Sequence, residues 1–489
     1  MRNILACILL LFSVLLCSAQ QVDINANMIT GINAAIELRF KNLETILSQE
    51  RKVNQENRVT DYLEAAALCT RIFLVEDETY YESKSDRLDF LIERLEDLPD
   101  SEPYKRVFLA EISLARAGIY AKFKSNIKAA WLFYRAYNLL EDNYKEYPQF
   151  APTLISLGVL QTAVGSLPGD YKSVASLFGF DGNIELGLKM IRQAYYYSIA
   201  DPKLKFHQSY FGFVYAYVNF ELATEEQVSL YTLDMNVKGS SLFSYLEARQ
   251  LLSNGQTALA LQLMENRLKG DGYLEVPFFD YYTGKLALMI SPEKAERYFL
   301  NFLQSTRDNE NRKSTYRYLA WYHLLKSEGE KAEMYRQKIL LEPAVTLSGP
   351  DKQAIAEAKR GFNVFLIRAR LDFDAGRYTK IIKDLDPKIV TKIGSEDWVS
   401  QEFYYRRARA FQELGFKDKA LEGFLKSSTW TEHETYSLGN GLLQIALLFE
   451  EKGNFKESRR YFIKALTLKS YAFHEGVHQK ARAGLERLP

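Results

Sequence analysis

Residues 402–468 constrain the fold of this 489-residue chain more than any other stretch. Two segments there share five residue positions, and the second segment follows the first by 38 residues. Small residues at the first and fourth positions let two helices approach closely, aromatic residues fill the space around them, and a glycine permits the turn between them. The positions are Ala408, Phe411, Gly415, Ala420 and Phe424, then Ala446, Phe449, Gly453, Ser458 and Phe462.

This pattern is typical of the tetratricopeptide repeat (TPR), a helix–turn–helix unit of about 34 residues. Further copies occur upstream, complete at 248–264 and partial around Gly284, Ala320 and Ala369. The chain is too long for one compact core but has an ordinary length for a protein that buries its surface repeat by repeat. We therefore predict an all-α, TPR-type α-solenoid, which is a right-handed superhelix of antiparallel helix pairs.

The beginning of the chain predicts export. A basic residue, Arg2, precedes an apolar run, and small residues precede a cut after Ala19, which together form a secretory signal peptide. A retained anchor is an alternative, although the run is short compared with the roughly 20 residues that a membrane helix needs. A lipoprotein cut before Cys17 is another alternative.

The predicted parts are a signal peptide at 1–19, a helical capping region at 20–103, a TPR-like region at 104–235 with a short helix inserted at 166–182, and a C-terminal TPR array with a closing helix at 236–489.

The charge balance and the cysteine content limit which classes of partner and which cellular compartment can be expected. Of the 63 basic residues Arg2 lies in the signal, which leaves 62 basic against 62 acidic residues in the exported chain. This balance argues against a nucleic-acid or anionic-membrane partner recognised by bulk charge. Only Cys69 remains outside the signal, so no internal disulfide is expected. Together with the lack of Asn-x-Ser/Thr sequons, this favours a bacterial periplasm.

Two interruptions break the repeats. After the helix expected at 151–165 comes the insertion, and the partner helix is expected to start near Asn183, capped by Asp181 or Asn183. A second interruption at 341–353 is interpreted as a loop between repeats, with a hinge or domain boundary as the alternative.

The first interruption resembles a known family. Gly158, the Ser-Leu-Pro run at 166–168, the segment 177–182 and the Leu-Gly-Leu run at 186–188 follow one another as they do in the tetratricopeptide repeat protein 39 family. That family includes the fungal mitochondrial outer-membrane inclusion-clearance proteins. Segments 282–285 and 295–299 are also similar, so the resemblance covers roughly 104–340. It implies an all-helical repeat scaffold without assigned catalytic residues. The export signal departs from that family, so its eukaryotic locations are not implied.

One motif near the end suggests enzyme chemistry. Residues 474–478, HEGVH, fit the H-E-x-x-H pattern, in which two histidines one helical turn apart bind zinc and the glutamate activates water. Only 11 residues follow His478, and Phe473, Val477, Ala481 and Leu485 have the spacing of a packing stripe. We interpret the motif as incidental and predict no catalytic residue, cofactor or metal, with a zinc metallopeptidase as the remote alternative.

The predicted function is that of an exported, non-catalytic scaffold that binds other proteins. First helices of the repeats are expected to line the inner face. The recurring arginines there could receive a partner's carboxylate or pair with neighbouring acids, and we favour the second interpretation. The alternative function is a small-molecule or glycan-binding periplasmic solenoid that uses a concavity rich in Tyr and Phe. The predicted partner-binding residues are Tyr245, Arg249, Asn363, Arg370, Tyr405 and Arg409.

Overall fold

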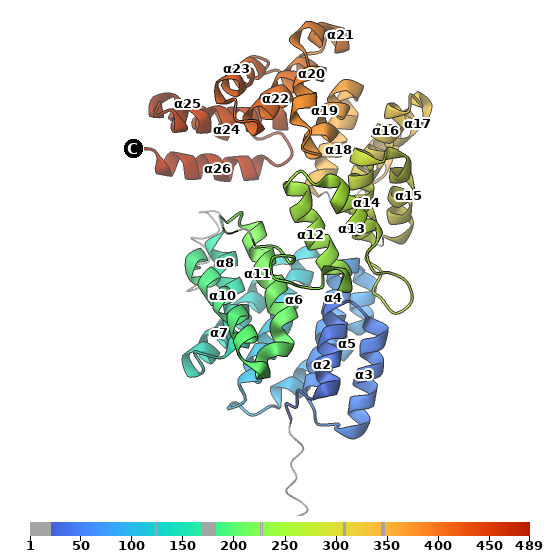
Figure 1. Cartoon of the computed structure of the whole chain (residues 1–489), viewed down its shortest axis with the longest axis vertical. Helices are drawn as coiled ribbons and strands as arrows, with labels where there is room; N and C mark the ends of the chain where they lie inside the picture. Colours follow the sequence, from blue (N-terminus) through green and yellow to red (C-terminus); the bar gives the residue numbers. More distant parts are fainter. Residues whose placement is uncertain are drawn as a thin grey trace, which may run out of the picture. The chain divides into compact units, whose positions relative to one another are not determined.

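A computed structural model describes residues 21–123, 125–167, 182–224, 226, 228–306, 310–343 and 348–489. The predicted signal peptide at 1–19 and residues 168–181 of the predicted insertion lie outside these described residues. In the described part of the chain all regular structure is helical, and consecutive helices pack as pairs (Figure 1). The predicted all-α, TPR-type architecture is therefore confirmed. Within the described residues, no helix has both the length and the apolar character needed to cross a bilayer.

The chain forms two compact units, which are described separately. Unit 1 comprises Met1–Glu247 and Asn266–Val276, and unit 2 comprises Ala248–Glu265 and Pro277–Pro489. Helix α12 (Ser241–Ser253) belongs to unit 1 in its first half and to unit 2 in its second half. The segment Asn266–Val276 packs on unit 1, where the Leu274 N–H donates to the Leu38 carbonyl at 2.7 Å.

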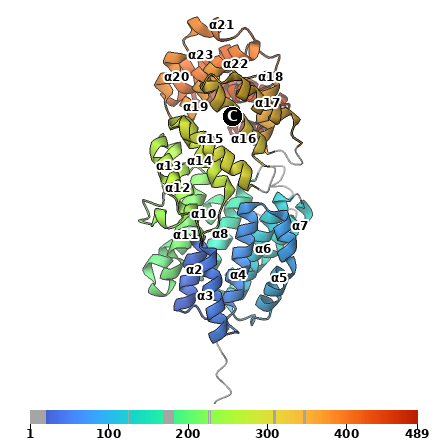
Figure 2. The same ribbon diagram turned by 90° about the vertical axis from the view of Figure 1, so that its right-hand side faces the viewer.

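Unit 1 is built from helices that lie side by side from α2 to α8 (Figure 2) and continue through α10 and α11. Its core is aliphatic and aromatic, with Leu63, Leu91 and Ile112 almost fully buried. The helices are α2 (Ala26–Ile36), α3 (Phe40–Val53), α4 (Val59–Val75), α5 (Glu78–Glu96), α6 (Pro103–Lys122), α7 (Asn126–Glu146), α8 (Ala151–Gly165), α10 (Ile184–Ala200) and α11 (Gln208–Glu221), with short 3₁₀ helices η1 (Pro202–His207) and η2 (Val237–Gly239).

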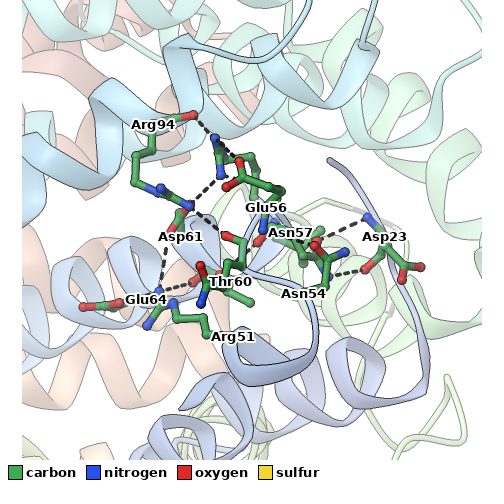
Figure 3. A network of polar contacts seen from close by, with 12 residues as sticks. Asp23, Arg51, Asn54, Glu56, Asn57, Thr60, Asp61, Glu64 and Arg94 are labelled. Atoms are coloured by element: carbon green, nitrogen blue, oxygen red, sulfur yellow. Dashed lines mark hydrogen bonds and ion pairs between the residues drawn. The ribbon is translucent and has the colours of Figure 1, made fainter. Parts of the chain in front are cut away.

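A polar network fixes the start of α4 (Figure 3). The buried carboxylate of Asp61 accepts hydrogen bonds from Arg94 Nε at 2.9 Å and from Arg51 at 3.3 Å. Asn57 Nδ2 donates to the Asp23 carbonyl at 2.9 Å, and the Asp23 N–H donates to Asn57 Oδ1 at 3.2 Å. These bonds join α3, α4, α5 and the N-terminal segment, so they set the register of these elements.

Helices α8 and α10 cross through two glycines. A Cβ added to Gly158 would lie 2.8 Å from the Gly187 carbonyl oxygen, and one added to Gly187 would lie 2.6 Å from the Gly158 carbonyl oxygen. Asn183 caps α10 by accepting a hydrogen bond from the Leu186 N–H at 2.9 Å. The partner helix that the sequence predicts after the insertion is confirmed, and its cap is Asn183.

Unit 2 repeats the helix pair more regularly, as the successive pairs α22–α23 and α24–α25 show (Figure 1). The helices are α13 (Thr257–Glu265), α14 (Pro277–Ile290), α15 (Pro292–Ser305), α16 (Arg312–Leu325), α17 (Gly329–Leu341), α18 (Gly349–Arg360), α19 (Val364–Asp374), α20 (Tyr378–Asp384), α21 (Val390–Ile393), α22 (Asp397–Glu413), α23 (Lys417–Ser427), α24 (Tyr436–Glu451), α25 (Phe455–Thr467) and α26 (His474–Arg487), with the 3₁₀ helix η3 (Pro387–Ile389).

The recurring small residues hold these pairs together. Ala408 and Ala420 have no exposed surface, and neither do Ala446 and Ser458 in the next pair. A Cβ added to Gly423 would lie 2.9 Å from the Ala408 Cβ, which shows how closely the paired helices approach. Because larger side chains would separate the helices, these positions carry the repeat pattern.

The turn between paired helices is also repeated, in α12–α13, α19–α20, α22–α23 and α24–α25. Glycines seven residues after the recurring alanine have φ between 72° and 80°, as at Gly415 and Gly453. The next N–H donates to the carbonyl five residues earlier, at 2.9 Å from Phe416 to Phe411 and at 2.9 Å from Asn454 to Phe449. This is a Schellman motif, which requires a left-handed residue at the glycine position.

The turn between α16 and α17 forms without a glycine at this position. Between α16 and α17 the left-handed residue is Ser327, with φ 64°, and the Glu328 N–H donates to the His323 carbonyl at 2.8 Å. The same turn is therefore formed by a residue with a Cβ, which costs about 1–2 kcal/mol relative to glycine.

The loop expected at 341–353 is shorter than the sequence analysis predicts. Helix α18 begins at Gly349, and Ser348 caps it by accepting a hydrogen bond from the Asp351 N–H at 3.3 Å. The prediction is wrong for the second part of this segment because Pro350 occupies the first helical turn, where proline is favoured.

The turn geometry predicts opposite effects for two substitutions. Gly415→Ala should lower the free energy of unfolding by about 1 kcal/mol, because a Cβ at positive φ is strained. No neighbouring atom lies within 4 Å of that Cβ, so backbone strain is the whole cause. Ser327→Gly should raise the free energy of unfolding by a similar amount. Urea denaturation followed by circular dichroism measures both, and a destabilised Ser327→Gly variant would contradict the turn assignment.

The α8–α10 crossing predicts a larger effect. Gly158→Ala should destabilise unit 1 by about 2–3 kcal/mol, because the new methyl group would overlap backbone atoms that cannot move independently. Gly476→Ala in α26 is the control, since no atom lies within 4 Å of its added Cβ. Thermal denaturation compares the two variants, and equal melting temperatures would show that the helices do not cross through these glycines.

Candidate functional site

The candidate site is a cavity of about 400 Å³ within unit 2. Tyr281 and Lys285 from α14 line it, together with Arg317, Tyr318 and Trp321 from α16. Its remaining walls come from α18, α19, α24 and α26. Helices α14, α16, α19 and α24 are first helices of their pairs, so the cavity lies on the face where TPR-type proteins bind partners.

Positive charge predominates in this cavity. Four basic side chains line it, Lys285, Arg317, Arg370 and Lys480, against the single acidic side chain of Glu357. The Arg317 guanidinium lies 3.5 Å from a Glu357 carboxylate oxygen. Within the described part of the chain, Lys285 and Lys480 have no carboxylate within ion-pair distance. The cavity therefore offers two ammonium groups that the protein itself does not neutralise.

Aromatic rings hold the cations in place. The Lys285 Nζ lies 5.8 Å from the centre of the Tyr281 ring and 5.9 Å from that of Tyr318. The Arg317 guanidinium carbon lies 4.8 Å from the Tyr318 ring centre and 5.0 Å from that of Trp321. Cation–π contacts of this kind orient a charge without neutralising it, so the cations stay available to an anionic ligand.

The neighbouring cations also act on the pKa of Tyr318. Burial raises the pKa of this phenol, but the neighbouring Lys285, Arg317 and Arg370 lower it by a larger amount, so the net shift is downward. A buried tyrosine normally shifts the other way. The electrostatic field of the three cations therefore outweighs desolvation at this position.

A second ionic cluster lies beside the cavity but is already satisfied. The buried Glu402 accepts hydrogen bonds from Arg360 at 2.6 Å and from Arg406 Nε at 2.9 Å. Burial raises the pKa of Glu402, and the two guanidinium groups more than compensate, lowering it to about 2. Because its charges are matched internally, this cluster supports α18 and α22 rather than offering a binding group.

The two predicted arginines in the middle of the array are paired with acids on their own helices. Arg370 Nε donates to Asp374 at 2.9 Å, and Arg409 donates to Glu413 at 2.7 Å. Arg370 also lines the cavity, and the nearby carboxylate of Asp374 raises its pKa. These pairs are the ones that we favoured from the sequence, yet Arg370 keeps a face towards the cavity.

Two other predicted residues have structural contacts. Asn363 is the N-cap of α19, where its Oδ1 accepts hydrogen bonds from the Phe365 and Leu366 N–H groups, and its Nδ2 donates to the Ile393 carbonyl at 2.6 Å. The buried Tyr405 hydroxyl accepts a hydrogen bond at 2.7 Å from Asn440, which itself lines the cavity.

The remaining two predicted residues lie on α12. Tyr245 belongs to unit 1 and Arg249 to unit 2, and both side chains are partly buried. The structure thus brings Arg370 to the cavity and Tyr405 next to a residue that lines it. Whether any of the six residues binds a partner remains a prediction.

Three cations of the cavity were not among the predicted partner-binding residues. Lys285, Arg317 and Lys480 lie on helices whose repeat positions are incomplete or, in α26, absent. The sequence contains one pattern that could have identified Lys285. Lys285 directly follows the recurring small residue Gly284, just as Arg249, Arg370 and Arg409 directly follow the recurring alanines of their repeats. A basic residue at this position in four repeats marks the inner face.

The HEGVH motif lies on the closing helix α26. His474 Nδ1 lies 3.0 Å from the Tyr471 carbonyl oxygen, and His478 Nε2 lies 2.8 Å from the Leu468 carbonyl oxygen. Val477 and Ala481 of the predicted packing stripe are buried and Leu485 is half-buried. The prediction is wrong for Phe473, which is 47% exposed because it precedes the helix as its N-cap. Among the described residues, no three His, Cys, Asp or Glu side chains form a group suited to a metal.

These contacts predict a structural role for His478. His478→Ala should lower the free energy of unfolding by about 1 kcal/mol through the lost hydrogen bond, without changing the zinc content of the purified protein. Elemental analysis with urea denaturation measures both quantities. One zinc per chain in the unsubstituted protein, lost in the variant, would instead support the metallopeptidase alternative.

Comparisons with known proteins add little. No protein-family model matches the chain, and neither does any curated protein. Among solved structures, the chain is similar to the human IFIT1 dimer with PPP-AAAA, at 13% sequence identity and a TM-score of 0.32, over 92% of this chain and 96% of that chain. At this level the similarity carries no functional argument, and the TPR-type assignment rests on the helix pairs and their recurring residues.

Proposed function

We propose that the protein is a non-catalytic TPR-type scaffold whose unit 2 binds an acidic segment of a partner protein. The observation that carries this proposal is the positive charge of Lys285 and Lys480 in the cavity. The other two cations that line it are already paired, Arg317 with Glu357 and Arg370 with Asp374. A carboxylate-bearing segment would be attracted by Lys285 and Lys480, which have no ion pair of their own in the described part of the chain.

The cavity also has apolar side chains that can contact a peptide. Tyr436, Leu443 and Phe473 line it beside the cations, and the Phe473 side chain is 47% exposed. Aromatic side chains supply large contact areas at low conformational cost, which is why they are common at binding hot spots. We therefore expect the preferred segment to combine Asp or Glu residues with at least one apolar side chain.

The compartment and the family are part of the same proposal. We propose that the chain is exported by its N-terminal signal to a bacterial periplasm, because only one cysteine lies outside the signal. The Gly158–Gly187 crossing of α8 and α10 is compatible with a relationship to the tetratricopeptide repeat protein 39 family, whose similar residues include both glycines.

Charge reversal tests the binding proposal. Short peptides selected from a random library on the purified protein should be enriched in Asp and Glu, and their affinities can be measured by fluorescence anisotropy. The double variant Lys285→Glu/Lys480→Glu should bind them about tenfold more weakly, because two attractive contacts become repulsive. The matched control is Lys392→Glu/Lys456→Glu, which changes the net charge equally at two exposed lysines away from the cavity.

Two results would contradict the proposal. Peptides selected without acidic enrichment would show that the positive cavity is not the binding surface. Equal weakening by the cavity variant and the control variant would show that only the overall charge matters.

A further inference from the structure

A second cavity, partly open to solvent, lies in unit 1 and differs in chemistry from the first. Its volume is about 290 Å³, and residues of α2, α4, α6, η1, α11 and the start of α12 line it. Aliphatic and aromatic side chains such as Ile32, Leu63, Phe108 and Phe243 make up most of the wall. Several lining residues, among them Ile32, Ala66 and Ala67, are partly exposed, so a ligand can reach the cavity from solvent.

Small side chains keep the cavity open. The three consecutive alanines of α4 have different surroundings. Ala65 is fully buried in the core, whereas Ala66 and Ala67 line the cavity. Ala115 of α6 lines it too. A leucine or phenylalanine at any of these three lining positions would extend into the cavity, so the space depends on local sequence.

The cavity contains a compact polar group on one side. Glu111 lines it, and its carboxyl oxygens accept hydrogen bonds from the Tyr62 hydroxyl and, at 2.6 Å, from Ser156 Oγ. The Tyr104 hydroxyl lies 3.4 Å from His207 Nε2, and both residues line the same cavity. These groups can donate or accept hydrogen bonds to a ligand while the remaining wall offers apolar contact.

Burial weakens the charges at this polar group. It raises the pKa of Glu111 against the opposing effect of the Ser156 and Tyr62 hydrogen bonds, and it lowers the pKa of His207 to about 3. Both shifts favour the uncharged forms. The cavity differs in this respect from the positive cavity of unit 2.

We propose that this cavity binds a single-chain, predominantly apolar molecule that ends in one uncharged hydrogen-bonding group, such as a long-chain or isoprenoid alcohol. The volume is close to the lower limit of about 300 Å³ for small-molecule sites, which suits one chain and excludes a two-chain lipid. Apolar cavities remain dry and take up apolar ligands, and the single polar group determines the ligand's orientation. This proposal is independent of the one made for unit 2.

The test uses the purified full chain and an uncharged fluorescent probe, N-phenyl-1-naphthylamine. The probe should bind saturably, and dodecanol should displace it more effectively than dodecylamine or laurate, because the polar group favours an uncharged head. Ala115→Phe should weaken probe binding at least tenfold by filling the cavity. Ala121→Phe is the matched control, since Ala121 is exposed on the same helix.

Other outcomes decide against the proposal. It is wrong if the unsubstituted protein shows no saturable binding, or if the Ala115→Phe and Ala121→Phe variants bind the probe equally. If dodecylamine displaced the probe more strongly than dodecanol, the proposal that the ligand has an uncharged polar end would be wrong. If Ala115→Phe does not fold, as judged by circular dichroism, Ala67→Leu takes its place with an expected threefold or greater loss, and unchanged affinity in that variant would equally refute the proposal.

Discussion

The structure depends on the close approach of paired helices through residues that have little or no side chain. In unit 2 this contact lies between Ala408 and Gly423, and in unit 1 between Gly158 and Gly187. Small residues at the crossing allow large rings such as Phe424 and Phe462 to be fully buried beside it. The glycine turn then returns the chain at a fixed angle, so that each pair presents one helix inward and the other outward.

The charged side chains of unit 2 fall into two groups. First helices contribute Lys285, Arg317 and Arg370 to the cavity of unit 2, where aromatic rings hold them. In the ion-pair cluster Arg360–Glu402–Arg406 the charges neutralise one another. This cluster fixes the position of α18 against α22 and leaves no charge free for a partner. Unit 1 uses the same helix pairing to form a cavity of nearly opposite character, with an apolar wall and one carboxyl group. One architecture thus supports two different surface chemistries.

The repeat could be predicted from sequence because alanine and glycine at fixed spacing have few other physical explanations. Residues 402–468 have the predicted helices, and Gly415 and Gly453 form the predicted turns. Ser327 was not recognised as a turn residue because its side chain is atypical of a left-handed conformation. Asn363 fell on the predicted inner face, but as a helix cap its side chain is bonded to backbone atoms. The cation cluster depends on residues up to about 195 positions apart, from Lys285 to Lys480, which no local pattern connects.

Amide hydrogen exchange, measured by mass spectrometry with and without a selected acidic peptide, tests most directly the claim that first helices bind while second helices support. The account predicts added protection in α14, α16, α18, α19, α24 and α26, whose residues line the cavity, and unchanged exchange in α15, α17, α23 and α25. Protection confined to the second helices would contradict it, because the peptide would then occupy the outer face of the pairs.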